Sequence, residues 1–249
     1  ELVIDEREKS DYIYLYNFYQ TEREIAYRIK KLQESKNIKK ILNLNTQLKK
    51  AEQISSIELS EKQREALKLV NENNVSIITG GPGTGKTTII KNIIEIYEEH
   101  GKKVILAAPT GRAAKRMTET TNKEASTLHR LLEIGKFDEE SFYKNTSDYE
   151  GAPIDADIII VDEMSMVDMF LMNYLLKCIY KGTKLVLVGD VDQLASVGPG
   201  SVLKDLINSE QIPTIHLEKI FRQAAKSKII LNAHKVNNGE NFLKKDESS

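Results

Sequence analysis

The chain has 249 residues, of which 40% are hydrophobic, and a nearly balanced net charge of −1. Such a length supplies one sizeable hydrophobic core or two small ones. The balanced charge excludes a protein that is basic throughout, as many nucleic-acid-binding proteins are, but it leaves room for a local basic groove.

The cysteine content and the apolar runs exclude further classes of protein. Cys178 is the one cysteine and lies in an apolar helical pattern, so neither a disulfide framework nor a zinc cluster is expected. No apolar run approaches the about 18 residues of a membrane span, and no signal peptide precedes the first charged segment. We therefore expect a soluble protein of the cytoplasm. Because the chain starts at Glu1 and stops in the polar segment 244–249, we also expect it to be part of a longer protein.

Residues 1–56 are predicted to be the end of an N-terminal region followed by a linker. The aromatic segment 11–20 leads into residues 21–32, whose apolar spacing predicts a helix. The tyrosines of this segment could stack on the bases of single-stranded nucleic acid, or they could belong to a half-buried strand, and the second interpretation is favoured. Residues 35–56, rich in Lys and Asn, fit a linker or a peripheral helix.

Residues 57–240 alternate between strand and helix patterns, after a capping box that opens a helix at Ser60. Apolar runs predict strands at 75–79, 103–108, 157–162, 184–189 and 213–216. Apolar spacing predicts helices at 86–99, 111–120, 126–133, 167–180 and 201–208. This order is typical of an α/β fold whose parallel sheet is covered by helices on both faces, with ligands bound beyond the carboxyl ends of the strands. A loop or small hairpin is expected at 135–153, and a polar tail at 241–249.

The segment 79–88, TGGPGTGKTT, fits the phosphate-binding loop pattern Gly-x-x-x-x-Gly-Lys-Thr and lies between a predicted strand and a predicted helix. Glycines allow successive backbone N–H groups to turn towards a phosphate at a helix N-terminus, whose dipole favours negative charge. Lys86 is then expected to reach the β- and γ-phosphates of a nucleoside triphosphate, and the Thr87 hydroxyl to bind Mg²⁺. The predicted nucleotide-binding residues of the loop are Gly81, Pro82, Gly83, Thr84, Gly85, Lys86, Thr87 and Thr88.

Two acids, Asp162 and Glu163, follow the apolar run 158–161. A carboxylate at this strand end can face Mg²⁺ held by the phosphate-binding loop. We expect Asp162 to hold the metal, through water, and Glu163 to act as general base on the attacking water. Two acids at a strand end also fit a solvated loop, but the phosphate-binding loop elsewhere in the chain favours the metal site.

Gln193 follows another apolar run, in the segment VGDVDQL at 188–194. Its amide could hydrogen-bond the γ-phosphate or the attacking water, and so signal hydrolysis to the rest of the chain. A structural turn is the alternative, and the local pattern fits both equally.

The segment 107–116, AAPTGRAAKR, closes a predicted strand and opens a predicted helix. Thr110 can cap this helix, which places free N–H groups beside three cations, among them Arg112. Such a site suits a backbone phosphate of nucleic acid, and the alternative is a solvated helix face. His129 follows on a second short helix, where a structural role is the more common one for a single histidine.

Taken together, these segments resemble those of superfamily 1 DNA helicases of the RecD-like group, the exodeoxyribonuclease V alpha-subunit family. The resemblance covers about residues 60–240 and is carried, in order, by GGPGTGKTT (80–88), AAPTGRAAKRM (107–117), STLHRLL (126–132), IIIVDEMSMVD (158–168), VLVGDVDQLASVGPGSVL (186–203) and LEKIFRQ (217–223). It implies a RecA-like motor lobe that uses ATP to move along single-stranded DNA, 5′ to 3′ in this family, in DNA recombination or repair.

The resemblance also implies roles for single residues. Gln63 resembles the glutamine that reads adenine, which makes ATP the expected nucleotide. Gln193 resembles the γ-phosphate sensor, and Arg222 the arginine that stabilises charge on the γ-phosphate in the transition state. With Lys86 and Glu163, these two complete the expected catalytic set.

The same resemblance implies a DNA groove. Thr110, Gly111, Arg112 and His129 fall in segments that line the single-stranded DNA groove in the family. Ser196 lies in the motif that couples the state of the nucleotide to the hold on DNA.

Members of this family hydrolyse ATP between two RecA-like lobes, and nothing after Gly239 resembles the second lobe, which supplies another arginine. The second lobe of the same parent chain and subunits of a nuclease complex are therefore expected partners. We expect the isolated piece to bind ATP·Mg weakly and to hydrolyse it poorly. One alternative is a nucleotide-regulated module that binds DNA or a nuclease partner without motor activity, which the presence of Glu163 disfavours. Another is an ATPase that acts on a substrate other than DNA, which the segment 107–117 disfavours.

Overall fold

The computed structural model describes residues 2–6, 11–36, 38–55, 58–134, 151–219, 221, 228–237 and 239–240. Within these residues, six parallel strands form a central sheet in the order β5-β4-β6-β7-β3-β8. The strands are β3 (Val75–Gly80), β4 (Val104–Ala108), β5 (Ala125–Thr127), β6 (Ile158–Val161), β7 (Lys184–Gly189) and β8 (Thr214–Leu217). The predicted α/β fold with a parallel sheet is confirmed.

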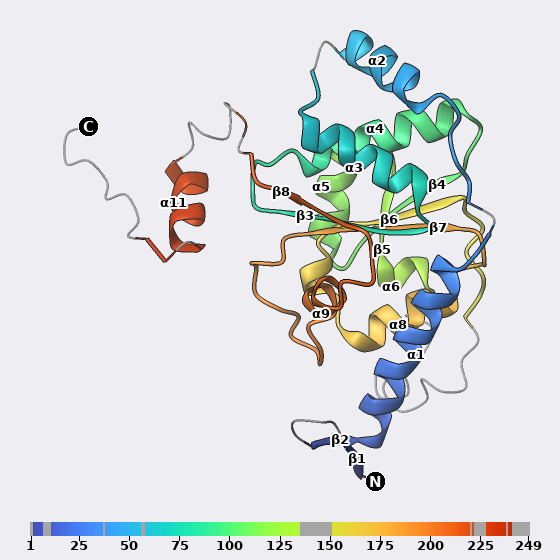
Figure 1. Ribbon diagram of the computed structural model, residues 1–249, viewed down its shortest axis with the longest axis vertical. Coiled ribbons are helices and arrows are strands. Elements are labelled where there is room, and N and C mark those ends of the chain that lie inside the picture. The colour runs from blue at the N-terminus through green and yellow to red at the C-terminus, as the bar shows by residue number, and fades with distance from the viewer. Residues whose placement is uncertain are drawn as a thin grey trace.

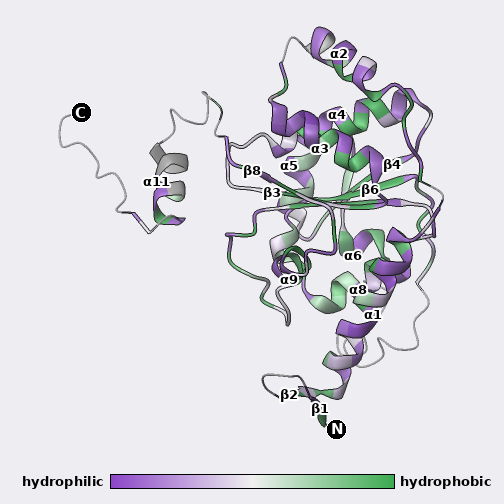
Figure 2. Ribbon diagram, in the orientation of Figure 1, coloured by the Kyte–Doolittle hydropathy of each residue, from purple (hydrophilic) through white to green (hydrophobic). Residues whose placement is uncertain are grey.

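The sheet separates two hydrophobic cores because successive side chains of a strand point to opposite faces. In β6, Ile158 and Ile160 belong to one core, and Ile159 and Val161 belong to the other. The first core is covered by α2 (Leu44–Ser55), α3 (Glu61–Glu72), α4 (Lys86–Glu99) and α5 (Gly111–Thr121). The second is covered by α1 (Tyr16–Gln33), α6 (Leu128–Leu131), α8 (Met169–Lys177) and α9 (Val202–Asn208). Figure 1 shows these two layers above and below the sheet, and Figure 2 shows that the strands between them are apolar.

The N-terminal residues form a hairpin and a long helix. The antiparallel strands β1 (Leu2–Asp5) and β2 (Tyr12–Leu15) lie beyond the body of the molecule, at the lower end of Figure 1. The expected half-burial of the tyrosine-rich strand is wrong: Tyr12 is 46% exposed and Ile13 70% exposed. The sequence pattern could not show that the strand pairs only with another exposed strand.

Helix α1 begins at Tyr16, five positions before the predicted start, and packs along α8. Its first turn is held by an edge-on contact between the rings of Phe18 and Phe170, with centroids 5.6 Å apart. Further along, Glu24 accepts a hydrogen bond from Asn173 Nδ2 at 2.9 Å. Three residues of α1 join the core that also contains α8. The division of the chain at residue 57 stays a prediction.

Two predicted helices have different bounds in the structure. Residues 125–127, inside or next to the predicted helix 126–133, are the edge strand β5, which pairs with β4 through Leu106 to Ala108. Only then does α6 begin, with Thr127 Oγ1 as its N-cap acceptor. The predicted helix 167–180 is shorter, because the 3-10 turn Met164–Met166 and the N-cap Asp168 come first.

Residues 44–55 form the peripheral helix α2, which packs on α4, and the capping box at Ser60 is present. Helix α11 (Lys228–Asn237) follows the sheet. Most of the expected loop 135–153, residues 135–150, and the expected tail 241–249 lie outside the described residues. None of the described helices combines the length and the apolar character that crossing a membrane requires.

Candidate nucleotide site

The phosphate-binding loop connects β3 to α4 at the carboxyl end of a central strand. Gly83 and Gly85 have φ angles of +79° and +88°, which side-chain-bearing residues rarely adopt. Thr84 Oγ1 donates to the carbonyl oxygen of Gly81 at 2.8 Å and closes the turn. Gly85 is also the N-cap of α4 and offers no side-chain acceptor. The first N–H groups of α4 are therefore left for a ligand at the positive end of the helix dipole.

The Lys86 ammonium lies against this loop, in the electrostatic field of acids that follow β6 and β7. Its Nζ donates to the carbonyl oxygen of Gly81 at 3.0 Å. Burial lowers the pKa of Lys86, and the negative charges of Asp190, Asp162 and Glu163 oppose that shift. The sheet thus brings the predicted lysine, the predicted acids and one further acid, Asp190, to a single edge.

Asp162 and Glu163 form a tight turn directly after β6. The N–H of Glu163 donates to Asp162 Oδ1 at 2.8 Å. Burial raises the pKa of Asp162, and the Lys86 ammonium acts in the opposite direction. Glu163 has a φ angle of +55°, a left-handed conformation that costs a side-chain-bearing residue about 1 kcal/mol or more and is concentrated at functional sites.

These residues fit Mg²⁺ that is carried by a phosphate ligand. No group of three or more metal-binding His, Cys, Asp or Glu side chains occurs among the described residues, so the protein does not form a complete cage there. Mg²⁺ usually keeps several waters and is bound through one or two protein oxygens plus substrate phosphates. The Thr87 hydroxyl and the Asp162 carboxylate supply oxygen ligands of that kind. Burial raises the pKa of Asp162 and so disfavours its charged form, which a nearby cation would stabilise.

Gln193 links two elements at this edge of the sheet. Its Nε2 lies 3.4 Å from Asp190 Oδ2, and its Oε1 lies 3.4 Å from the hydroxyl of Ser165 in the turn after Glu163. Its backbone N–H donates to the carbonyl oxygen of Asp190 at 3.2 Å. These contacts show that Gln193 stabilises a turn beside Asp190, and its role towards a γ-phosphate stays a prediction.

A cavity of about 660 Å³ opens at the carboxyl ends of β3, β7 and β8. Its walls include residues 79–82 of the loop, residues 190–193 and residues 216–218. Binding sites for small ligands commonly have volumes of about 300–1,000 Å³. The cavity is therefore large enough for the phosphate end of a nucleotide.

Gln63 lies on the outer side of the loop and is only 2% exposed. Its Oε1 accepts a hydrogen bond from Ser60 N at 2.9 Å, as a capping box requires. An ideal Cβ placed on Gly85 would lie 2.3 Å from Gln63 Nε2 and 3.0 Å from the ring of Phe221. Phe221 N also donates to the carbonyl oxygen of Gly83 at 3.2 Å. Three separate segments therefore meet at the loop.

Phe221 is the residue of this neighbourhood that the sequence prediction missed. The signal that could have found it is an aromatic residue directly before Arg222, in a segment already assigned to the site. Arg222 itself lies outside the described residues.

The comparisons with known proteins agree with this geometry. Residues 58–246 match the family model described as "AAA domain", which is about three quarters of the chain. The chain belongs to the AAA domain family.

The relatives of this AAA domain confirm the expected RecD-like resemblance. It is 43% identical over 182 residues to the ATP-dependent RecD2 DNA helicase of Deinococcus radiodurans, an alignment that covers 73% of the chain and 24% of that protein. It is 35% identical over 214 residues to RecBCD enzyme subunit RecD of Buchnera aphidicola, covering 78% of the chain and 34% of that protein. The chain thus spans about a quarter to a third of the length of these relatives.

Solved structures of helicases have a fold similar to that of this chain. The Pif1 helicase from Candida albicans superposes on this AAA domain with a TM-score of 0.53 and 27% sequence identity, over 76% of the chain and 46% of that structure. A second solved structure concerns DNA unwinding at forked DNA by two coordinating Pif1 helicases. One of its chains superposes with a TM-score of 0.51 and 25% sequence identity, over 77% of the present chain and 50% of that chain.

The predicted DNA-contacting residues of the AAA domain follow three different strands, all at the carboxyl edge of the sheet. Thr110 follows β4, and its Oγ1 accepts from Ala113 N at 3.2 Å, which confirms the predicted helix cap. Gly111 and Arg112 are exposed in the first turn of α5, and His129 is exposed on α6 after β5. These two segments are neighbours because β4 pairs with β5.

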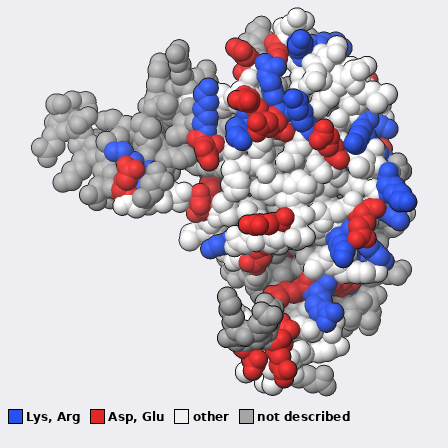
Figure 3. All heavy atoms as spheres, in the orientation of Figure 1, with Lys and Arg blue, Asp and Glu red and all other residues white. Residues whose placement is uncertain are grey.

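Ser196 lies apart from them, in the loop after β7. Its hydroxyl hydrogen-bonds the carbonyl oxygens of Gly198 and Gly200 at 3.0 and 3.1 Å, so its contacts lie within its own loop. Strand β6 separates the strand before this loop from β4. On the face shown in Figure 3, acidic and basic side chains are interspersed, in agreement with the balanced net charge.

Proposed function

We propose that the chain is the ATP-binding motor lobe of a DNA helicase or translocase, which in the whole protein moves 5′ to 3′ along single-stranded DNA in recombination or repair. The observation that carries the proposal is the meeting of Lys86 with Asp162, Glu163 and Asp190 at one edge of the sheet, beside a helix N-terminus that has no side-chain cap. The similarity to proteins named DNA helicases supports the choice of substrate.

In the proposed reaction, the chain binds and orients ATP through its own residues. The loop N–H groups and Lys86 hold the phosphates. Thr87 and Asp162 would hold Mg²⁺, which neutralises phosphate charge when it is bound. Glu163 accepts a proton from the attacking water, and Gln193 responds to the γ-phosphate and passes its state to Asp190 and to Ser165 in the turn after Glu163.

The adenine is proposed to lie by Gln63 and Phe221, on the outer side of the loop. Their contacts around Gly85 support this position, since an amide can hydrogen-bond a base and an aromatic ring can stack on it. Because Gln63 Oε1 already accepts from Ser60 N, its Nε2 is the atom left to face a base acceptor.

Single-stranded DNA is proposed to cross the carboxyl edge of β4 and β5. The exposed first turn of α5 offers backbone N–H groups and Arg112 to a phosphate, and His129 lies on the neighbouring α6. Ser196 is proposed to take part through the loop that follows Gln193.

The second RecA-like lobe and Arg222 are proposed to complete the catalytic site. Arginines that stabilise transition-state charge increase turnover about 10³–10⁵-fold in related phosphoryl-transfer enzymes. One relative is named an ATP-dependent RecD2 DNA helicase, and another a subunit of the RecBCD enzyme. Co-purification of the whole protein from its host would decide which setting applies here.

The direct test is steady-state ATP hydrolysis by the whole protein, with and without a single-stranded oligonucleotide, beside a Lys86→Ala variant. We expect strong stimulation by DNA and its loss in the variant. Hydrolysis that ignores DNA would instead favour an ATPase with another substrate. Nucleotide and DNA binding without any hydrolysis would favour the nucleotide-regulated binding module.

A further inference from the structure

A fully buried lysine lies at the edge of the sheet opposite the nucleotide site. Lys184 is the first residue of β7 and is 0% exposed. Its Nζ donates to the carbonyl oxygens of Val70, Asn71 and Asn73 at 2.9, 3.0 and 2.7 Å. These three bonds use all three N–H donors of an ammonium group.

The three carbonyl groups belong to the last turn of α3 and the residue that caps it. Carbonyl groups at a helix C-terminus lack partners within the helix and carry the negative end of its dipole, so they favour a cation. Burial acts against the charge and lowers the pKa of Lys184 to about 7. A shift of α3 along β7 would break these bonds and leave a buried ammonium without hydrogen-bond partners. Such a state costs considerable free energy, so the bonds oppose the shift.

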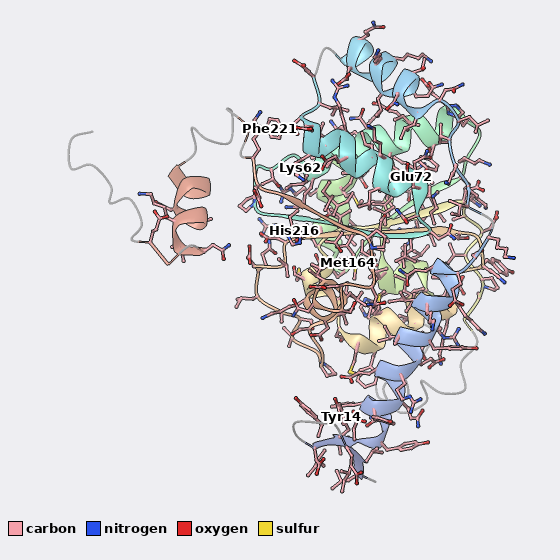
Figure 4. All side chains as sticks on the ribbon, viewed as in Figure 1. Tyr14, Lys62, Glu72, Met164, His216 and Phe221 are labelled. Carbon is pink, nitrogen blue, oxygen red and sulfur yellow. The ribbon has the colours of Figure 1, made fainter. Side chains whose placement is uncertain are left out.

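The other end of α3 touches the phosphate-binding loop. The helix has twelve residues and is about 18 Å long at 1.5 Å per residue. In Figure 4, Lys62 marks its first turn, close to Phe221, and Glu72 marks its last residue at the far side. Gln63, in that first turn, packs against Gly85 so closely that no side chain fits between them.

Apolar packing and polar bonds restrain α3 in different ways. Ala66, Leu67 and Val70 hold it against the sheet, but apolar contacts are non-directional and resist a shift along the helix axis only weakly. The bonds of Lys184 add a directional restraint on that axial position relative to β7, beside the bond from Leu185 N to the carbonyl oxygen of Asn74 at 2.7 Å. The same strand ends at Gly189, directly before Asp190, so it anchors α3 at one end and leads to an acid of the nucleotide site at the other.

We propose that Lys184 is a positioning residue for nucleotide binding: by fixing α3 along its axis, it keeps Gln63 seated against the phosphate-binding loop. The inference rests on the proposed binding of ATP at that loop. It assigns a function to a side chain that lies at the opposite end of α3 from the ligand.

The test is a double-mutant cycle on nucleotide affinity, measured in the whole protein with a fluorescent ADP analogue. Lys184→Met removes the donors with little change of volume, and we expect it to weaken ADP binding about fivefold while DNA affinity stays unchanged. In a Gln63→Ala background the same change should have less than a twofold effect, because its target is already gone. Lys184→Gln, which keeps two N–H donors, should fall between wild type and Lys184→Met.

Leu175→Ala is the matched control, since Leu175 is also fully buried but lies in α8 on the other face of the sheet. It should lower the thermal midpoint and leave ADP affinity in place. The inference would be overturned if Lys184→Met weakened ADP binding equally in the wild-type and Gln63→Ala backgrounds. It would also be overturned if Lys184→Met or Lys184→Gln, shown to be folded by circular dichroism, lost no ADP affinity. If wild type failed to bind ADP, and Lys86→Ala behaved identically, the proposed function would fall instead.

Discussion

At the scale of single residues, Glu163 carries the sharpest prediction. Glu163→Gln removes the proposed base but keeps the size of the side chain, so ADP affinity should stay within about twofold while ATP turnover falls about 10²–10⁴-fold. Glu72→Gln, an exposed change at the far end of α3, is the matched control and should leave turnover unchanged. Turnover that survives in Glu163→Gln would assign the base to another group.

Arg112 carries the corresponding prediction for DNA. Arg112→Ala should weaken binding of a single-stranded oligonucleotide and reduce the slope of log affinity against log salt by about 0.7, the value for one phosphate contact on a single strand. Fluorescence anisotropy over a salt series measures both quantities. Lys181→Ala, an exposed change at the opposite edge of the sheet, should alter neither. An unchanged slope in Arg112→Ala would place this residue outside the groove.

At the scale of elements, the loop after β7 is packed tightly on the start of α8. Asp168 caps α8 by accepting from Leu171 N at 2.8 Å, and an ideal Cβ on Gly198 would lie 2.1 Å from the other oxygen of that carboxylate. Gly198→Ala should therefore displace the cap and destabilise the fold by about 1–3 kcal/mol. Loss of the cap in Asp168→Ala costs about 1 kcal/mol.

If the clash with the carboxylate is the cause, the two losses of stability will not add. The double variant Gly198→Ala/Asp168→Ala should lose less stability than the sum of the two single variants, in thermal or urea unfolding. Part of the loss should remain, because the Cβ of residue 168, which alanine keeps, lies 2.8 Å from the added Cβ. Additive losses would mean that Gly198→Ala destabilises the fold for a reason other than its clash with Asp168.

The elements that the sequence predicts well are those whose pattern depends on burial alone. Strands β3, β6 and β7 are central and apolar on both faces, so their runs of Ile, Val and Leu define them within about one residue. Strand β5 was missed because its three residues, Ala125 to Thr127, are half-buried and pair only at the edge of the sheet. The exposed hairpin was misjudged because a strand pattern does not reveal what covers the strand.

The residues of the candidate site also fall into two groups, those that the sequence predicts and those that it does not. Lys86, Asp162 and Glu163 could be predicted because short motifs fix them relative to a strand end. Phe221 and Asp190 had only weak signals, a position directly before Arg222 and a position directly after a predicted strand. Their proximity to the loop depends on which strands become neighbours. Lys184 had no signal at all, because a lysine at the start of a strand is usually solvated and its partners are backbone carbonyl groups.

At the scale of the whole molecule, the chain is proposed to be one half of a catalytic site. Turnover by the 249-residue chain should be at least about 10³-fold slower than turnover by the whole protein, with ADP binding still measurable. Comparing steady-state ATP hydrolysis of the two, each with saturating oligonucleotide, checks this expectation. Equal rates would show that the second lobe contributes no charge to the transition state.

The order of strands has a consequence for local opening of the fold. Strands β6 and β7 are each flanked by two partners, whereas β5 is a three-residue edge strand beside β4. Amide hydrogen exchange should accordingly be slowest in the strands that carry the acids and faster in the strand that leads to His129. The part of the proposed hold on DNA at His129 then follows a strand that opens more readily than β6 and β7, so it can rearrange while those two strands stay closed.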